Sequence, residues 1–319
     1  MKKIVCLSTD MNGFAYEQQV FADRGDAEFL ISPARTKQDV VAAVKDADVI
    51  LFTDITFDKA LLDQLEKCKL IIRYGIGYDN IDTAYAKEKG IMVCNAPNYG
   101  VIDVAEHALS LLLSCAKRLP YMGSVMKDGK WFSADMGKSQ RLYGKKVGFV
   151  GFGKIARCVC ERTNALGMKA LVYDPYVTAE ALDMYHAQPV TLEELLKASD
   201  YITLHLPLTE QTQHMFGKAE FERMKPSAVL INTSRGKLVD EAALVQALAD
   251  DVIAGAGLDV FEDETRDLDP RLLKMQQVTL TPHVAWNTVD GGIALHQEVT
   301  GNVVRFLEGE HPESIVNGL

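Results

Sequence analysis

The chain has 319 residues, of which 48% are hydrophobic and 24% are charged, and its formal net charge is −10. These values are typical of a globular protein of about two domains, and the acidic balance argues against binding to nucleic acid through clustered basic residues. The sequence has no run of the roughly 20 apolar residues that span a membrane, and the apolar run after Lys3 is too short for a signal peptide. We therefore expect a cytoplasmic protein without a membrane partner.

The six cysteines are dispersed along the chain, and the closest pair, Cys158 and Cys160, has the spacing C-x-C. Metal sites and redox motifs typically use C-x-x-C, with further ligands nearby. We therefore expect reduced thiols and no metal site.

In the first hundred residues, short apolar runs alternate with helical patterns such as 37–45 and 59–66. This alternation predicts a parallel sheet with helices on both faces. The predicted strands are 3–7, 27–31, 49–52, 70–73 and 92–94.

A longer helix is predicted over residues 101–119, because Val104, Ala108 and Leu111 recur at helical spacing and Pro120 closes the pattern. A second alternating series then begins after the polar stretch 127–130. Its predicted strands are 147–150, 170–173, 201–204, 228–231, 253–258 and 278–280. A last helix, 290–307, has an apolar stripe that must be buried, and we expect it to return to the first series.

The stretch 145–156, KKVGFVGFGKIA, places two glycines between a predicted strand and a predicted helix that starts at Lys154. Gly151 permits a tight turn, and Gly153 lets the backbone approach a pyrophosphate, which the N–H groups of the helix N-terminus would bind. Ala156 stands where a third glycine is usual, and alanine is small enough for that position. The pattern indicates a dinucleotide-binding turn.

The next predicted strand ends at Asp174, 23 residues after Gly151. A carboxylate at about this spacing accepts hydrogen bonds from the adenosine ribose and repels a 2′-phosphate, which favours NAD over NADP. The alternative is a purely structural turn, with Asp174 as a solvated carboxylate.

Several further motifs occur in one order along the chain: NAP at 95–97, VAEHAL at 104–109, HLPLT at 205–209, NTSRG at 232–236, LDVFEDE at 258–264 and TPH at 281–283. With the glycine turn, this set resembles the D-isomer-specific 2-hydroxyacid dehydrogenases over nearly the whole chain. The resemblance implies an α/β protein of two domains with parallel sheets. These are a flavodoxin-like substrate domain, residues 1–98 plus 287–319, and a Rossmann NAD-binding domain, residues 99–286. It also implies a substrate cleft between them and a homodimer.

The resemblance makes Arg235, Glu264 and His283 the catalytic set. A guanidinium suits the carboxylate and carbonyl of a 2-oxo acid, imidazole can give or take a proton near neutral pH, and a carboxylate orients the imidazole. Because Glu262 and Asp263 are also acidic, composition alone does not choose among them. The family pattern selects Glu264, and a solvated acidic loop is the alternative.

The expected cofactor contacts lie in the glycine turn and at the ends of later strands. Asp259 either contacts the nicotinamide or caps its strand, and Trp286 either walls the nicotinamide site or belongs to the core. The full predicted set is Gly151, Gly153, Lys154, Ile155, Asp174, His205, Pro207, Thr212, Thr233, Ser234, Asp259 and Trp286.

The stretch 73–82, RYGIGYDNID, is expected to hold the substrate, because its glycines can expose backbone N–H groups to a carboxylate. Arg73 either meets a second anionic group or is a surface residue at a strand end. The predicted substrate-binding residues are Arg73, Tyr74, Gly75, Ile76, Gly77, Asn98 and Arg235.

The expected substrate is a small 2-oxo or 2-hydroxy acid. Arg73 and NAPN at 95–98 are similar to the phosphoglycerate type, in a short form without an appended regulatory domain. Hydroxypyruvate or glyoxylate, lactate and bulkier acids stay open. The alternative function is an NAD(H)-sensing partner protein, because the resembling family includes transcriptional corepressors; the Arg–Glu–His set favours an enzyme.

Overall fold

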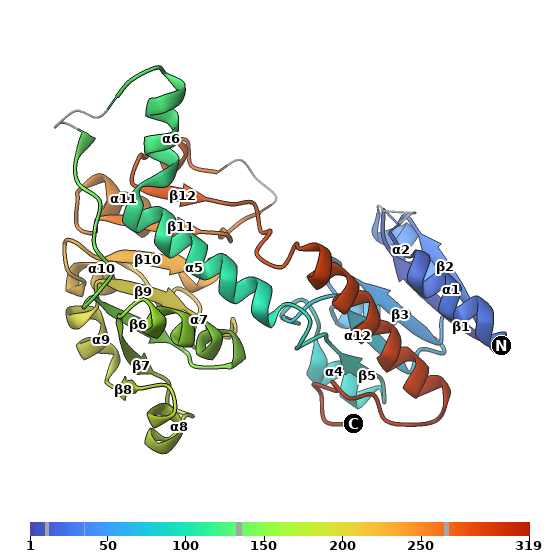
Figure 1. Ribbon diagram of the computed structural model, residues 1–319. Helices are drawn as coiled ribbons and strands as arrows, with labels where there is room; N and C mark the ends of the chain where they lie inside the picture. The colour runs from blue at the N-terminus through green and yellow to red at the C-terminus, as the bar shows by residue number, and fades with distance from the viewer. Residues whose placement is uncertain (10–12, 35, 132–135, 265–267) are drawn as a thin grey trace. The chain divides into compact units, whose positions relative to one another are not determined.

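The structure is a computed structural model that describes residues 1–9, 13–34, 36–131, 136–264 and 268–319. The chain forms two compact units, one of Met1–Gly100 with Thr288–Leu319 and one of Val101–Asn287 (Figure 1). Within the described ranges, no helix combines the length and the apolar character needed to cross a membrane.

The first unit is built on a five-stranded parallel sheet in the order β2-β1-β3-β4-β5. This is the flavodoxin-like order, as predicted. The apolar runs form these strands because a strand covered on both faces has no solvated side; all four residues of β3 are buried. The strands are β1 (Lys2–Leu7), β2 (Ala27–Ser32), β3 (Val49–Phe52), β4 (Leu70–Arg73) and β5 (Met92–Cys94).

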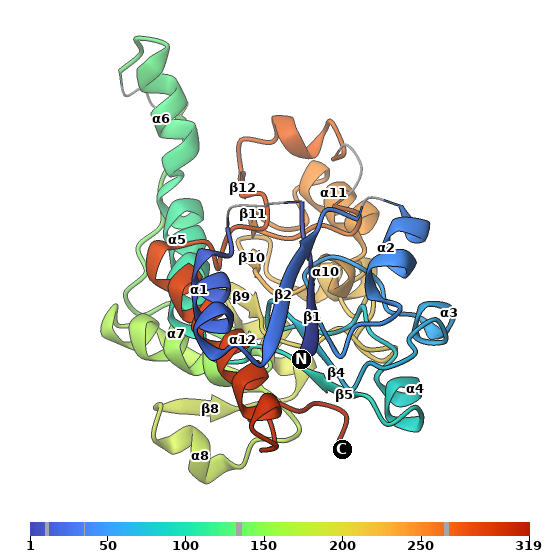
Figure 2. The same cartoon turned by 90° about the vertical axis from the view of Figure 1, so that its right-hand side faces the viewer.

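The helices of the first unit are α1 (Ala15–Arg24), α2 (Lys37–Val44), α3 (Lys59–Leu62), α4 (Thr83–Glu88) and α12 (Val289–Leu307). The predicted helix 59–66 is too long, because the N–H of Glu66 leaves the helical pattern and donates to Lys45 O at 3.0 Å. The last helix buries the stripe Leu295, Val299 and Val303 and packs against α1, as both views show (Figures 1 and 2).

The second unit contains a seven-stranded parallel sheet in the order β12-β11-β10-β9-β6-β7-β8. This is the Rossmann order, as predicted. The chain adds β7 and β8 on one side of β6 and β9 to β12 on the other, so the strand order reverses between β6 and β9. The predicted strand 253–258 begins two residues later, at Gly255, because the turn at Asp251, with φ 53°, continues as bends through residues 252–254. The strands are β6 (Lys146–Val150), β7 (Lys169–Tyr173), β8 (Ala187–Pro189), β9 (Tyr201–Leu204), β10 (Val229–Asn232), β11 (Gly255–Leu258) and β12 (Val278–Leu280).

The helix predicted over 101–119 is two helices, because Arg118 adopts the left-handed conformation with φ 55°. Pro120 therefore lies in the first turn of α6, where proline is tolerated, and does not close α5. The helices of this unit are α5 (Val101–Lys117), α6 (Leu119–Lys127), α7 (Lys154–Ala165), α8 (Ala179–Asp183), α9 (Leu192–Ala198), α10 (Lys218–Arg223) and α11 (Glu241–Ala249), with 3₁₀ turns η2 (Gly236–Leu238) and η3 (Leu272–Lys274).

Candidate active site

The polar candidates of the second unit follow successive strands of one sheet. Gly151 follows β6, Asp174 follows β7, His205 follows β9, Thr233 follows β10 and Asp259 follows β11. Because all these strands are parallel, their carboxyl ends lie along one edge. The reversal of strand order between β6 and β9 marks this edge as the place where open α/β sheets bind ligands.

The glycine turn brings two backbone segments close together. Gly151 has a φ of +86°, and a Cβ added there would lie 2.6 Å from the carbonyl oxygen of His205. Gly153 precedes the first turn of α7, and a Cβ added there would meet nothing within 4 Å. A helix N-terminus with open space in front of it suits the pyrophosphate of a dinucleotide.

Asp174 is held beside this turn by two backbone N–H groups. Its Oδ2 accepts a hydrogen bond from Phe152 N at 2.8 Å, and its Oδ1 accepts one from Tyr176 N at 2.9 Å. The carboxylate is half-buried at the end of β7. Its place next to the glycine turn suits a contact with the adenosine ribose of NAD.

Two neighbouring side chains at the end of β10 differ in their hydrogen bonding. The hydroxyl of Ser234 donates to Leu204 O at 2.7 Å, whereas Oγ1 of Thr233 is buried and has no partner among the described residues. A buried polar atom without a partner needs one. A bound dinucleotide would supply it, so the residues at this edge fit NAD.

The His205 ring lies at the same edge and is neutral. Burial lowers its pKa to about 3, and its Nε2 lies 2.9 Å from Thr203 Oγ1. The following segment is held by Thr212, whose hydroxyl donates to Pro207 O at 2.7 Å. The His205 ring therefore adds no charge beside a bound cofactor. Lys154 and Ile155 begin α7 on the other side of the point where the strand order reverses.

The predicted residues Arg235, Glu264 and His283 lie together. His283 Nδ1 is 2.7 Å from Glu264 Oε2, and each side chain is 40% exposed. Burial raises the pKa of Glu264, but the hydrogen bond from His283 and the charges of His283 and Arg235 outweigh it and lower the pKa below its ordinary value. Glu264 is therefore a carboxylate that can orient the imidazole and stabilise its protonated form.

Glu262 and Glu264, in the acidic stretch 262–264, contact different histidines. Glu262 Oε1 lies 2.8 Å from Nε2 of His214, and its Oε2 accepts a hydrogen bond from the N–H of Glu241 at 3.3 Å. Glu262 is therefore engaged away from His283. Glu264 is the carboxylate that contacts His283.

Asp259 is fully buried and holds the segment that carries His283. Its Oδ1 accepts hydrogen bonds from Thr281 Oγ1 at 2.6 Å and Val284 N at 3.0 Å, and its Oδ2 accepts one from Ala285 N at 2.9 Å. Burial raises the pKa of Asp259, but these bonds and one from His107 outweigh it and lower the pKa. The Asp259 carboxylate therefore caps the loop after β12. The two predicted roles of Asp259, a contact with the nicotinamide and a cap of its own strand, did not include this one.

His107 on α5 is a member of this network that the sequence analysis missed. Its Nε2 lies 2.8 Å from Thr281 Oγ1 and 3.4 Å from Asp259 Oδ1. A signal was present, because His107 interrupts the apolar face made by Val104 and Leu111. Trp286, further along the loop, is only half-buried and does not belong to the fully buried core.

The candidates of the first unit form a separate set at the end of β4. Gly75 O accepts a hydrogen bond from Ala96 N at 2.9 Å, and Ile76 O accepts one from Asn95 Nδ2 at 2.6 Å. In the described chain, the N–H groups of Ile76 and Gly77 have no acceptor. Consecutive N–H groups of this kind suit a carboxylate.

Arg73 and Asn98 lie at the two ends of this set. The guanidinium of Arg73 lies against Gly75, and its Nε donates to Thr53 O at 3.2 Å. Nδ2 of Asn98 donates to Glu298 Oε1 at 2.9 Å. Arg73 therefore places a positive charge beside the loop, while the amide of Asn98 is engaged within its own unit.

Comparison with known proteins places this geometry in a family. Residues 109–285 match the family model of the NAD binding domain of D-isomer specific 2-hydroxyacid dehydrogenases. The chain is 41% identical to a glyoxylate reductase of Thermococcus litoralis over 85% of this chain and 83% of the relative. It is 38% identical to a D-3-phosphoglycerate dehydrogenase of Methanocaldococcus jannaschii over 94% of this chain, but this spans only 57% of that relative.

Solved structures show the same likeness over the whole chain. The D-lactate dehydrogenase of Aquifex aeolicus, in complex with NAD and lactic acid, has a TM-score of 0.90 and 30% identity over 99% of both chains. The matched family model covers the glycine turn, the buried Asp259 and the Arg–Glu–His set. The chain therefore belongs to the D-isomer-specific 2-hydroxyacid dehydrogenases and is an NAD-dependent oxidoreductase.

Proposed function

We propose that the protein interconverts a small D-2-hydroxy acid and its 2-oxo acid, with Arg235, Glu264 and His283 as its catalytic residues. The observation that carries the proposal is the 2.7 Å contact of His283 Nδ1 with a Glu264 carboxylate that also feels the charge of Arg235. NAD, bound at the glycine turn, supplies or accepts the hydride.

His283 moves the proton. Because Glu264 holds Nδ1, Nε2 is the ring nitrogen left to face the substrate oxygen. In the reductive direction, the imidazolium gives its Nε2 proton to the carbonyl oxygen as negative charge develops there. In the oxidative direction, the neutral ring takes the hydroxyl proton, and the Glu264 carboxylate stabilises the cation that forms.

Arg235 binds and polarises the substrate. Its guanidinium has parallel donors that suit a carboxylate and the adjacent carbonyl oxygen of a 2-oxo acid. Among the other predicted cofactor contacts, the orphaned hydroxyl of Thr233 has the strongest support. Asp259 acts on this chemistry through the loop that it holds.

In this proposal, the first unit supplies further substrate-binding groups. We assign the carboxylate to the N–H groups of Ile76 and Gly77, which have no acceptor in the described chain. The charge of Arg73 beside Gly75 favours an acid with a second anionic group, such as a phosphate. The two relatives compared above are named for glyoxylate and for 3-phosphoglycerate, so both classes of acid belong in the test.

The first experiment follows NADH absorbance with glyoxylate, hydroxypyruvate, pyruvate and 3-phosphohydroxypyruvate. We expect His283→Ala and Arg235→Ala to lower kcat/KM by about 10²- to 10⁴-fold, because each removes a group that acts on the reacting atoms. Exposed His311 and Arg223 provide matched controls, and His311→Ala and Arg223→Ala should retain the wild-type rate.

The same panel tests the substrate class. Arg73→Gln should raise KM for 3-phosphohydroxypyruvate about tenfold and leave KM for glyoxylate within about twofold. Equal effects on both acids would contradict a second anion site. If the wild type binds NADH but reduces no acid, the catalytic assignment fails and the NAD(H)-sensing alternative takes its place.

We also propose that the protein is a homodimer of the cytoplasm. Within the second unit, α6 projects away from the sheet, as Figure 2 shows. The segment 119–131 exposes Leu119, Met126 and Trp131, with 55%, 53% and 80% of their surfaces accessible. Apolar side chains gathered on one projecting segment suit a protein interface, and two-fold dimers are the commonest assembly. The six free cysteines support a reducing compartment.

A further inference from the structure

The first unit contains a buried carboxylate that none of the roles above uses. Glu17 on α1 is fully buried, and its Oε1 accepts hydrogen bonds from the Tyr74 hydroxyl at 2.8 Å and from His296 Nδ1 at 2.6 Å. Its Oε2 is also buried and has no hydrogen-bond partner in the part of the chain that the structure describes. Three segments therefore meet at one oxygen atom: α1, the turn after β4, and α12.

Stability alone gives a poor reason for this arrangement. A buried carboxylate loses its hydration, and a partner-less oxygen does not recover it. An aliphatic side chain beside Phe21, on the buried face of α1, would avoid both costs. The arrangement is therefore better explained by what the carboxylate holds in place.

What it holds is the ring of Tyr74. The rings of Phe14, Tyr74 and His296 lie with their centroids 5.6 Å apart in each pair. Burial and the charge of Glu17 raise the pKa of the Tyr74 hydroxyl well above its ordinary value, so that it donates a hydrogen bond. The packing of the three rings and this hydrogen bond together leave Tyr74 a single orientation.

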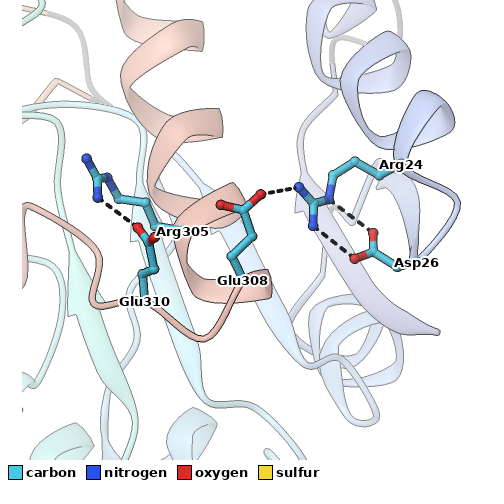
Figure 3. Close-up of polar contacts among 5 residues, drawn as sticks. All are labelled: Arg24, Asp26, Arg305, Glu308 and Glu310. Carbon is cyan, nitrogen blue, oxygen red and sulfur yellow. Dashed lines mark hydrogen bonds and ion pairs between the residues drawn. The ribbon is translucent and has the colours of Figure 1, made fainter.

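The two helices that carry Glu17 and His296 are also tied together at their ends. Arg24, at the end of α1, binds Asp26 through two hydrogen bonds and reaches Glu308, just beyond α12, at 2.8 Å (Figure 3). Arg305 on α12 pairs with Glu310 in the same region (Figure 3). The Arg24–Glu308 contact thus joins α1 to the end of α12 independently of Tyr74.

Tyr74 directly precedes the loop that carries Ile76 and Gly77, whose N–H groups face no acceptor in the described chain. The carbonyl groups of Gly75 and Ile76 are bound by residues 95 and 96, and Tyr74 N donates to Phe52 O at 2.8 Å. The ring of Tyr74 is therefore a side-chain anchor at the start of this loop, beside the guanidinium of Arg73. A shift of the ring would re-aim the N–H groups of Ile76 and Gly77.

We propose that Glu17 and His296 are positioning residues that fix Tyr74 and so direct the N–H groups of Ile76 and Gly77 at the substrate carboxylate. This inference rests on the proposed function of that loop.

The test separates KM from kcat. Glu17→Ala should raise KM for the best 2-oxo acid about tenfold, with kcat within about threefold and the affinity for NADH unchanged, because the loop binds the substrate and not the cofactor. Glu17→Gln keeps an acceptor for Tyr74 and should restore most of the loss. Tyr85→Phe removes another tyrosine–carboxylate bond of the first unit, 2.6 Å to Asp63, and should change nothing.

A second readout does not depend on turnover. Hydrogen exchange of the peptide 70–80, measured by mass spectrometry on the full chain, should be about tenfold faster in Glu17→Ala and unchanged in Tyr85→Phe. If the wild type reduces no 2-oxo acid, the proposed function fails, while exchange still tests the positioning. If Arg235→Ala raises KM but Glu17→Ala keeps the wild-type KM and exchange, the positioning fails.

Two further outcomes are informative. Should Glu17→Ala not fold, Tyr74→Phe removes one hydroxyl and must shift KM and exchange in the same direction for the inference to stand. A parallel loss of kcat, substrate affinity, NADH affinity and melting temperature would assign Glu17 a general structural role and overturn the inference.

Discussion

His283 has an unusual backbone for a residue with this task. Its φ is 54°, a left-handed conformation that costs about 1–2 kcal/mol for a residue other than glycine. The N–H of His283 donates to Asp259 O at 2.7 Å, and its ring is bound to Glu264. The surrounding bonds therefore hold the imidazole in one place, which would preorganise it for the proton transfer that we propose.

The charge of Glu264 can be tested through pH. Its pKa is held below the ordinary value of about 4.3, so the carboxylate is ionised at neutral pH. It is protonated, and loses its negative charge, only as the pH falls through that lower value. Glu264→Gln should lower kcat/KM by about 10- to 100-fold at neutral pH. The difference in kcat/KM between the wild type and Glu264→Gln should persist down to about pH 4 and shrink only below that pH.

The control for this experiment is Glu262→Gln, since Glu262 pairs with His214 and not with His283. We expect it to keep kcat/KM within about twofold of the wild type at every pH. A wild-type advantage over Glu264→Gln that disappears already near pH 6 would contradict an ion-paired Glu264.

At the scale of elements, close backbone packing brings Arg235 to Glu264. A Cβ added at Gly236 would overlap the carbonyl of Phe261, so the 3₁₀ turn η2 passes directly against the segment after β11. Arg235 precedes this turn and Glu264 follows that segment. The pairing of two neighbouring strand ends thus brings the proposed catalytic residues together, and no side chain larger than hydrogen fits at Gly236.

The loop after β12 depends on Asp259 in a way that can be measured. Asp259→Asn replaces one acceptor oxygen with an NH₂ group that would face a backbone N–H. We expect a loss of about 2–4 kcal/mol in the free energy of unfolding at neutral pH. Because the folded pKa of Asp259 is lowered, the loss should shrink as the pH falls below about 4.

Urea unfolding at several pH values measures this effect. Asp250→Asn, an exposed change in the same unit, is the control and should leave the urea midpoint in place. Equal midpoints for Asp259→Asn and the wild type at neutral pH would show that the loop does not depend on the carboxylate.

At the scale of the whole molecule, the chain forms two units whose boundaries fall at residues 100–101 and 287–288. Each unit has its own parallel sheet and its own set of polar residues at the carboxyl ends of its strands. The proposed substrate loop and the proposed catalytic histidine therefore belong to different units.

The proposed dimer is a prediction at this scale. Leu119→Glu combined with Met126→Glu should convert a dimer to a monomer in sedimentation at about 10 μM, because charges would replace apolar contacts in the buried part of an interface. Met184→Glu alters another exposed methionine, 74% accessible on the surface of the same unit, and should remain dimeric. A wild type that sediments as a monomer would contradict the proposal.

Local sequence patterns were sufficient for much of the fold. The buried runs of β3 and β6 and the glycine turn at Gly151 were predicted because strand burial and turn chemistry are written in adjacent residues. The break at Arg118 was missed, because helical periodicity continues through it. The residue types of the predicted catalytic set were also readable, although their roles stay a prediction.

Composition left open which carboxylate meets which histidine. The family resemblance selected Glu264 for His283, whereas the other two pairs appear only in the tertiary structure. Glu264 pairs with His283, Glu262 with His214 and Glu17 with His296, across sequence separations of 19, 48 and 279 residues. No local pattern specifies such pairs, since they depend on how distant elements pack and where their side chains then point. Chemistry that needs only adjacent residues could be read from the sequence, and chemistry that needs a contact across the fold required the structure.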